Sequence, residues 1–66
     1  MNVVINGTEE KLVPGLSILD YLSTKELHPE TIVVEHNLKI IESSGFHDVM
    51  LQGGDKLEIL RFFGGG

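Results

Sequence analysis

The sequence predicts an α+β fold, in which a mixed sheet of four to five strands carries one main helix on one of its faces. Three observations lead to this prediction. Hydrophobic residues recur at period two near both ends of the chain, a capped segment with helical spacing lies between them, and turn signals separate short β-branched runs. With 66 residues, the chain has room for one core, so we expect a single domain over residues 1–66.

The first two strands are expected to form a hairpin. Apolar residues alternate along the opening segment at Met1, Val3 and Ile5. Asn6-Gly7 follows, a strong signal for a tight turn with positive φ at both positions. The returning strand is expected from Glu9 to Val13, with Leu12 towards the core, and Pro14-Gly15 ends it.

A helix of about two turns is expected after this hairpin. Ser17 is a candidate N-cap, and Asp20 lies three residues later, where it would complete a capping box. The apolar residues on one helical face are Ile18, Tyr21 and Leu22. The helix should end near Leu27, because the residue before a proline disfavours helical geometry and His28-Pro29 follows. We expect Tyr21 to serve packing and not chemistry.

The second half of the chain is expected to add three strands. They run from Thr31 to His36, from Lys39 to Ile41 and from Lys56 to Phe62. Ser43-Ser44-Gly45 begins a single helical turn that carries Phe46 and Val49 inward. Gly53-Gly54-Asp55-Lys56 is interpreted as a turn into the last strand, because the full phosphate-binding pattern of a P-loop is missing.

This order of elements is that of the β-grasp fold. A right-handed connection over the helix places the last strand parallel to the first, and we infer the strand order 2-1-5-3. Alternation along the last strand puts Leu57 and Ile59 against the helix. Leu60 and Phe62 then lie on the open face.

That open face is a candidate docking surface for a partner protein. Its predicted members are Phe62, Phe63, Leu60, Val4 and Val33. An apolar patch beside a chain end is typical of an interaction site, although scattered apolar surface residues are the plainer alternative.

The run Phe62-Phe63-Gly64-Gly65-Gly66 is the most informative segment. Glycine makes up about 7% of average protein, so chance would place three glycines at about 0.03% of chain ends. A frayed end or a cloning scar remains as an alternative. Residues without Cβ can enter a narrow channel and present the carboxylate of Gly66 to a partner's active site. We expect residues 63–66 to form a flexible tail, because ordering glycine costs the most backbone entropy.

Composition excludes several classes of site and partner. The formal charge is −5, which disfavours nucleic acid and anionic membrane surfaces. Cysteine is absent, and the histidines lack the spacing of a metal site, so we expect neither a metal nor a bound cofactor. No leader or membrane-spanning run is visible, and we expect a cytoplasmic protein.

Several segments together resemble the sulfur carrier proteins of the thiamine pathway, the ThiS family of ubiquitin-like β-grasp proteins. They are Val3-Val4-Ile5-Asn6-Gly7, Val33-Val34-Glu35-His36-Asn37, Gly54-Asp55-Lys56-Leu57-Glu58-Ile59 and Phe62-Phe63-Gly64-Gly65-Gly66. Two positions depart from the family's pattern: Leu38 stands where a glycine often follows the hairpin asparagine, and Ile41-Glu42-Ser43 replaces a step like Val-Pro-Arg.

The resemblance implies a role as protein substrate, with no catalytic residue in the chain itself. A ThiF-type adenylyltransferase would use ATP to adenylate Gly66, a sulfur donor enzyme would supply the sulfur of a thiocarboxylate, and thiazole synthase would accept it. Three alternatives remain open: a carrier for molybdopterin or another product, a ubiquitin-like modifier joined to proteins through Gly66, and an interaction module whose tail is idle.

Overall fold

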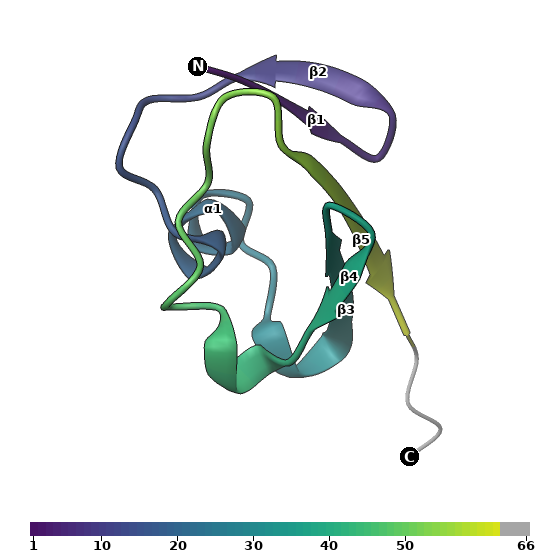
Figure 1. Cartoon of the computed structure of the whole chain (residues 1–66). Helices are drawn as coiled ribbons and strands as arrows, with labels where there is room; N and C mark the ends of the chain where they lie inside the picture. The colour runs from purple at the N-terminus through teal and green to yellow at the C-terminus, as the bar shows by residue number, and fades with distance from the viewer. Residues whose placement is uncertain (63–66) are drawn as a thin grey trace.

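The computed structural model describes residues 1–62, which form one helix and one five-stranded sheet. Figure 1 shows the helix on one side of the sheet, whose other side is left uncovered by helix. The strands are β1 (Asn2–Ile5), β2 (Thr8–Lys11), β3 (Ile32–His36), β4 (Lys39–Ile41) and β5 (Lys56–Arg61). The helical elements are α1 (Ile18–Thr24) and two 3₁₀ turns, η1 (Pro29–Thr31) and η2 (Ser43–Gly45).

The sheet has the strand order β2-β1-β5-β3-β4. β1 and β5 are parallel, and the other neighbouring strands are antiparallel. This confirms the predicted mixed sheet, with β4 added as the edge strand beside β3. Figure 1 shows why the parallel pair is possible: the chain passes over α1 and returns through β3 and β4 before β5 enters the centre of the sheet.

The core lies between α1 and the inner face of the sheet. Its buried apolar residues are Val3, Ile5, Ile18, Tyr21, Leu22, Ile32, Val34, Phe46, Leu51 and Leu57. The capping box is present: the Asp20 backbone N–H donates to Ser17 Oγ at 3.0 Å, and the Ser17 N–H donates to Asp20 Oδ2 at 2.9 Å. Leu12, Val49 and Ile59 pack against the core and are partly buried, which agrees with their predicted inward orientation.

Several predicted boundaries are displaced. β2 ends at Lys11 and β5 at Arg61, short of the predicted Val13 and Phe62. β2 begins at Thr8 because the Asn6-Gly7 turn has only two residues, so that Ile5 pairs directly with Thr8. β3 begins at Ile32, since η1 occupies the preceding residues. α1 ends at Thr24 because Glu26 adopts a positive φ of 56°.

The end of α1 is a Schellman motif. The Leu27 N–H donates to the Leu22 carbonyl at 2.9 Å, and the Glu26 N–H donates to the Ser23 carbonyl at 3.1 Å. These bonds satisfy two carbonyls that a helix terminus otherwise leaves without a partner. Glu26 occupies the position that glycine usually takes in this motif.

The β3–β4 hairpin turns through Asn37 and Leu38, with φ values of 50° and 71°. The first hairpin makes the same kind of turn through Asn6 and Gly7, with φ values of 49° and 82°. A left-handed conformation costs an L-residue with a Cβ about 1 kcal/mol or more, whereas glycine adopts it freely. Leu38 is 89% exposed, so its side chain recovers little of that cost through burial.

Replacing Leu38 with glycine should therefore stabilise the protein. We expect Leu38→Gly to raise the free energy of unfolding by up to about 1 kcal/mol, because relief of strain exceeds the added entropy of the unfolded chain. Urea unfolding measures the change. Leu38→Ala is the matched control, since it removes the same exposed side chain but keeps a Cβ, and it should leave stability nearly unchanged. Equal stabilisation by both variants would contradict the strain argument.

The two faces of β5 should respond differently to truncation. Leu57 is 1% exposed, so Leu57→Ala should cost about 2–5 kcal/mol by opening a cavity in a small core. Leu60 is 65% exposed, so Leu60→Ala should change stability by about 0.5 kcal/mol or less. Thermal or urea unfolding of the two variants, compared with the parent chain, provides the measurement. A larger loss at Leu60 than at Leu57 would be inconsistent with this register.

Candidate functional site

The predicted docking residues within the described part of the chain lie on the face of the sheet opposite α1, but the fold brings only some of them together. Leu60 of β5 is paired with Val33 of β3, and Phe62 follows on the same side with 46% of its surface exposed. Val4 is on the same face but is paired with Lys56, at the other end of β5. Four residues of extended strand separate the two positions by about 13 Å. The apolar patch therefore consists of Val33, Leu60 and Phe62, and Val4 lies apart from it.

β5 extends beyond β1, which leaves the last part of β5 with one strand neighbour. The β1–β5 register covers Val4 and Ile5. On the opposite side, β3 accompanies β5 as far as Arg61, and the Phe62 N–H then donates to the Thr31 carbonyl at 3.0 Å. The segment that leads to the predicted tail is thus attached to the sheet through β3. The remaining site residues, Phe63, Gly64, Gly65 and Gly66, lie outside the described residues.

Asn6 continues the pairing of β5 where β1 ends. Its side-chain Oδ1 accepts a hydrogen bond from the Ile59 N–H at 2.7 Å, and its Nδ2 donates to the Ile59 carbonyl at 3.2 Å. The amide group of Asn6 therefore satisfies both backbone groups of one residue in β5. The Asn-Gly pattern predicted the turn but not this contact, because the partner is 53 residues away in the sequence.

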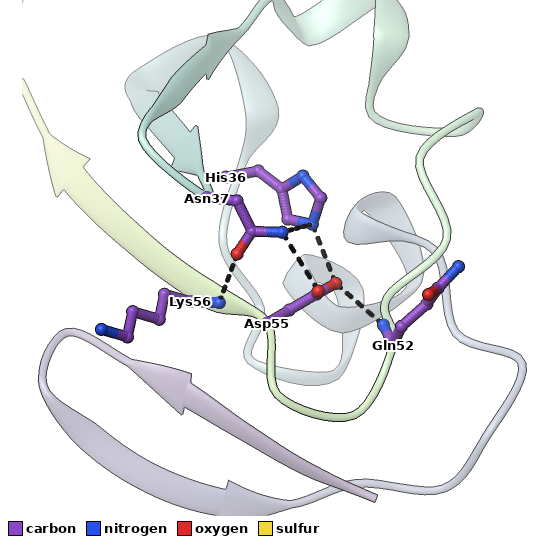
Figure 2. Close-up of polar contacts among 5 residues, drawn as sticks. All are labelled: His36, Asn37, Gln52, Asp55 and Lys56. Carbon is purple, nitrogen blue, oxygen red and sulfur yellow. Dashed lines mark hydrogen bonds and ion pairs between the residues drawn. The ribbon is translucent and has the colours of Figure 1, made fainter.

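A polar cluster joins the β3–β4 turn to the start of β5 (Figure 2). Asp55 Oδ2 lies 2.8 Å from His36 Nε2 and accepts the Gln52 N–H at 2.8 Å. Asp55 Oδ1 accepts a hydrogen bond from Asn37 Nδ2 at 3.1 Å, and Asn37 Oδ1 accepts the Lys56 N–H at 2.9 Å. The turn that precedes β5 is thereby tied to the end of β3.

The ionised form of Asp55 is favoured in this cluster. Burial acts to raise the pKa of its carboxyl, but hydrogen bonds from His36, the Gln52 N–H and Asn37, together with the charge of His36, outweigh it. The pKa of Asp55 is therefore lower than the ordinary value for aspartate. An ionised carboxylate only accepts hydrogen bonds, so His36 Nε2 carries the proton in this contact. The sequence assigned no metal-binding role to His36, and its contact with Asp55 is visible only in the folded chain.

A second polar contact attaches the edge strand β2 to the helix. The Tyr21 hydroxyl donates to Glu10, with distances of 3.2 and 3.1 Å to the two carboxylate oxygens, and Lys25 Nζ lies 3.4 Å from Glu10 Oε1. Burial, followed by the hydrogen bond and the negative charge of Glu10, raises the pKa of Tyr21 to about 12. Tyr21 therefore stays neutral and serves packing, as predicted.

A model of the ThiS family matches residues 3–66 of this sequence. The chain belongs to the ThiS family. The sulfur carrier protein ThiS of Bacillus subtilis is 38% identical over 63 residues, which cover 94% of this chain and 96% of that protein. That relative is named a sulfur carrier protein, which is the class that the resemblance in the sequence predicted.

Solved structures confirm the β-grasp fold of this ThiS-family chain. The crystal structure of the thiamine biosynthesis protein ThiS from Geobacter metallireducens has a TM-score of 0.86 at 30% identity, with all of both chains covered.

A thiazole synthase of Paramagnetospirillum magneticum is 36% identical over all 66 residues, which make up 20% of that relative. The chain likewise spans 20% of a thiazole synthase from Magnetococcus marinus.

The described residues contain neither a candidate metal site nor a candidate membrane span. Within residues 1–62, no group of three or more His, Cys, Asp or Glu side chains could hold a metal ion. No helix in this part of the chain is long and apolar enough to cross a membrane.

The Asp55 cluster should stabilise the fold in a pH-dependent manner. Because the pKa of Asp55 is lower in the folded state, its contribution is present above the unfolded value of about 4 and is lost as the pH falls through the folded value. At neutral pH, Asp55→Asn should cost about 1 kcal/mol through weaker hydrogen bonds. The difference in melting temperature between parent and variant should shrink on acidification.

Asp48→Asn provides the matched control for this prediction. Asp48 also lies beside a histidine, at 3.2 Å from His47, but both side chains are largely exposed. Exposed pairs of this kind contribute little to stability. We expect the difference in melting temperature between Asp48→Asn and the parent to be independent of pH. A difference in melting temperature for Asp55→Asn that stays constant down to strong acid would argue against the ionised cluster.

Proposed function

We propose that this chain carries sulfur for the thiazole part of thiamine, with the carboxylate of Gly66 as the group that is loaded. The observation that carries this proposal is the match to the ThiS family, which extends through Gly64, Gly65 and Gly66. In this proposal a ThiF-type adenylyltransferase, a sulfur donor enzyme and thiazole synthase are the partners. The Bacillus relative is named a sulfur carrier, and the names of two other relatives supply the link to thiazole synthase.

The chemistry requires activation by a partner, because a carboxylate has no good leaving group. In the proposed adenylation, the carboxylate oxygen of Gly66 attacks the α-phosphorus of ATP and pyrophosphate leaves. Hydrosulfide released by the sulfur donor then attacks the acyl carbon, a C–S bond forms, and the C–O bond to AMP breaks. The product is a thiocarboxylate, and no change of oxidation state is needed because the sulfur arrives as sulfide. The chain needs no bound cofactor for these steps, since ATP is bound by the adenylyltransferase. Dependence on ATP is also our reason to propose a cytoplasmic location.

The shape of the chain supports this division of roles. Acyl adenylates are hydrolysed in water, so the carrier end must react inside a partner that excludes solvent. Glycines without Cβ suit a narrow channel, and a rigid domain behind them supplies the binding surface that positions the end. We assign the initial docking to Leu60, Phe62, Phe63 and Val33, with Val4 at the periphery of the surface.

The length and end of the tail should be critical for sulfur loading. Deletion of Gly66, or addition of one residue after it, should abolish loading while the circular dichroism spectrum and melting temperature stay unchanged. The measurement is intact mass after incubation with ATP, a sulfur source and the ThiF-type enzyme, which detects the replacement of oxygen by sulfur. The parent chain, ending in a free Gly66 carboxylate, is the positive control.

The same measurement, repeated after the product is incubated with thiazole synthase, separates the alternatives. A product larger by the mass of a second protein would support a ubiquitin-like modifier. A thiocarboxylate that thiazole synthase does not accept would support a carrier for molybdopterin or another product. An unchanged mass for the parent chain would contradict both carrier proposals.

A further inference from the structure

The outer face of β3, β4 and β5 contains a shallow depression beside the apolar patch. It has a volume of about 300 Å³ and is lined by Val33, Glu35, Ile40, Glu58 and Leu60. Figure 1 shows the three strands side by side on the part of the sheet that leads to the chain end. The register places Val33 opposite Leu60, and it places Glu35 opposite both Glu58 and Ile40. The depression is therefore lined by two carboxylates and three apolar side chains.

The facing pair of glutamates is unfavourable for the isolated domain. Like charges directly opposite each other on an antiparallel ladder destabilise the sheet. Within residues 1–62, the ion pairs are Lys25–Glu10, His36–Asp55 and His47–Asp48, so neither Glu35 nor Glu58 is neutralised there. Lys56 lies in β5 two residues before Glu58 and therefore on the same face, yet it forms no ion pair with either glutamate in this part of the chain.

Two of the apolar side chains that line the depression are largely exposed to solvent. Leu60 is 65% exposed and Ile40 is 60% exposed, although both belong to strands whose other face is packed against the core. Apolar surface next to a carboxylate pair matches a partner surface in which a cation is surrounded by apolar groups. The planar guanidinium of arginine can bond two carboxylates through separate N–H groups, and it is more weakly hydrated than an ammonium group.

We propose that this depression receives a cationic side chain, most suitably an arginine, that projects from an apolar surface of the ThiF-type adenylyltransferase. The inference rests on the proposed function and adds the chemistry by which the partner is recognised. Val33, Ile40 and Leu60 contact the apolar surroundings of the cation, while Glu35 and Glu58 bind its charge. A bound cation offsets the repulsion between the two glutamates. The Glu35–Glu58 pair is therefore unfavourable in the free domain and becomes favourable in the complex. The net charge of −5 adds long-range attraction to a basic partner surface.

The test compares charge-neutral variants with a matched control. Glu35→Gln, Glu58→Gln and the double variant keep the size of the side chains and remove the charges of the depression. Glu26→Gln removes one charge from an exposed residue that lies outside the depression, two residues after the end of α1. Dissociation constants for the ThiF-type adenylyltransferase are measured by isothermal titration calorimetry at low and moderate salt, and melting temperatures are measured for each free variant.

The double variant should bind about tenfold more weakly or worse, and should lose most of the salt dependence of binding. Its melting temperature should equal or exceed that of the parent, because a like-charge pair has been removed. Glu26→Gln should bind within about twofold of the parent. Glu58→Lys should bind more weakly than Glu58→Gln, because it places a cation against the partner's cation.

The remaining outcomes overturn the inference in distinguishable ways. If the parent chain is loaded with sulfur but the double variant binds as tightly as the parent, the cation site is wrong and the proposed function stands. If Glu26→Gln weakens binding as much as the double variant, net charge and not this depression explains the effect. If the parent chain neither binds the adenylyltransferase nor gains sulfur, the proposed function and the cation site both fail.

Discussion

The pairing of β5 on both of its sides is the interaction on which the rest of this structure depends. β1 binds it in parallel through Ile5 and Leu57, and β3 binds it in antiparallel fashion from His36 to Ile32. A shift of one residue would move Leu57 from the core to solvent, so the core and the ladder specify the same register. The same alternation then requires Glu58 and Leu60 to lie on the outer face. One constraint thus determines the core and the surface offered to a partner.

Two asparagines strengthen this pairing where strands stop. Asn6 bonds both backbone groups of Ile59 beyond the end of β1, and Asn37 bonds the Lys56 N–H at the start of β5. Asp55 adds a connection to His36 across the same region. In a domain of this length the core alone supplies modest stability, so the loss of a polar contact that holds the central strand is a significant change.

The residues of the outer face, unlike those of the core, are not explained by the stability of the free domain. The exposed Leu60 and the facing Glu35 and Glu58 do not improve the stability of the free domain. Such residues are understandable if their favourable contacts form only with another protein. A sulfur carrier that supplies no catalytic group of its own has to be recognised by each enzyme it serves, and its surface is then the part on which specificity depends.

The sequence by itself determined the element types and the two faces of β5, because periodicity, capping and turn residues are local signals. The rule that crossover connections are right-handed extended these signals to the strand order 2-1-5-3, to which the structure adds β4. The Gly64-Gly65-Gly66 ending and the resemblance to a known family directed the functional prediction in the same way. Only the tertiary structure decided the contacts of Asn6 and Asp55 and the facing pair of glutamates. It also decided that Val4 lies apart from Leu60. These features join residues far apart in the chain, and their positions depend on strand register in three dimensions, which no local pattern encodes.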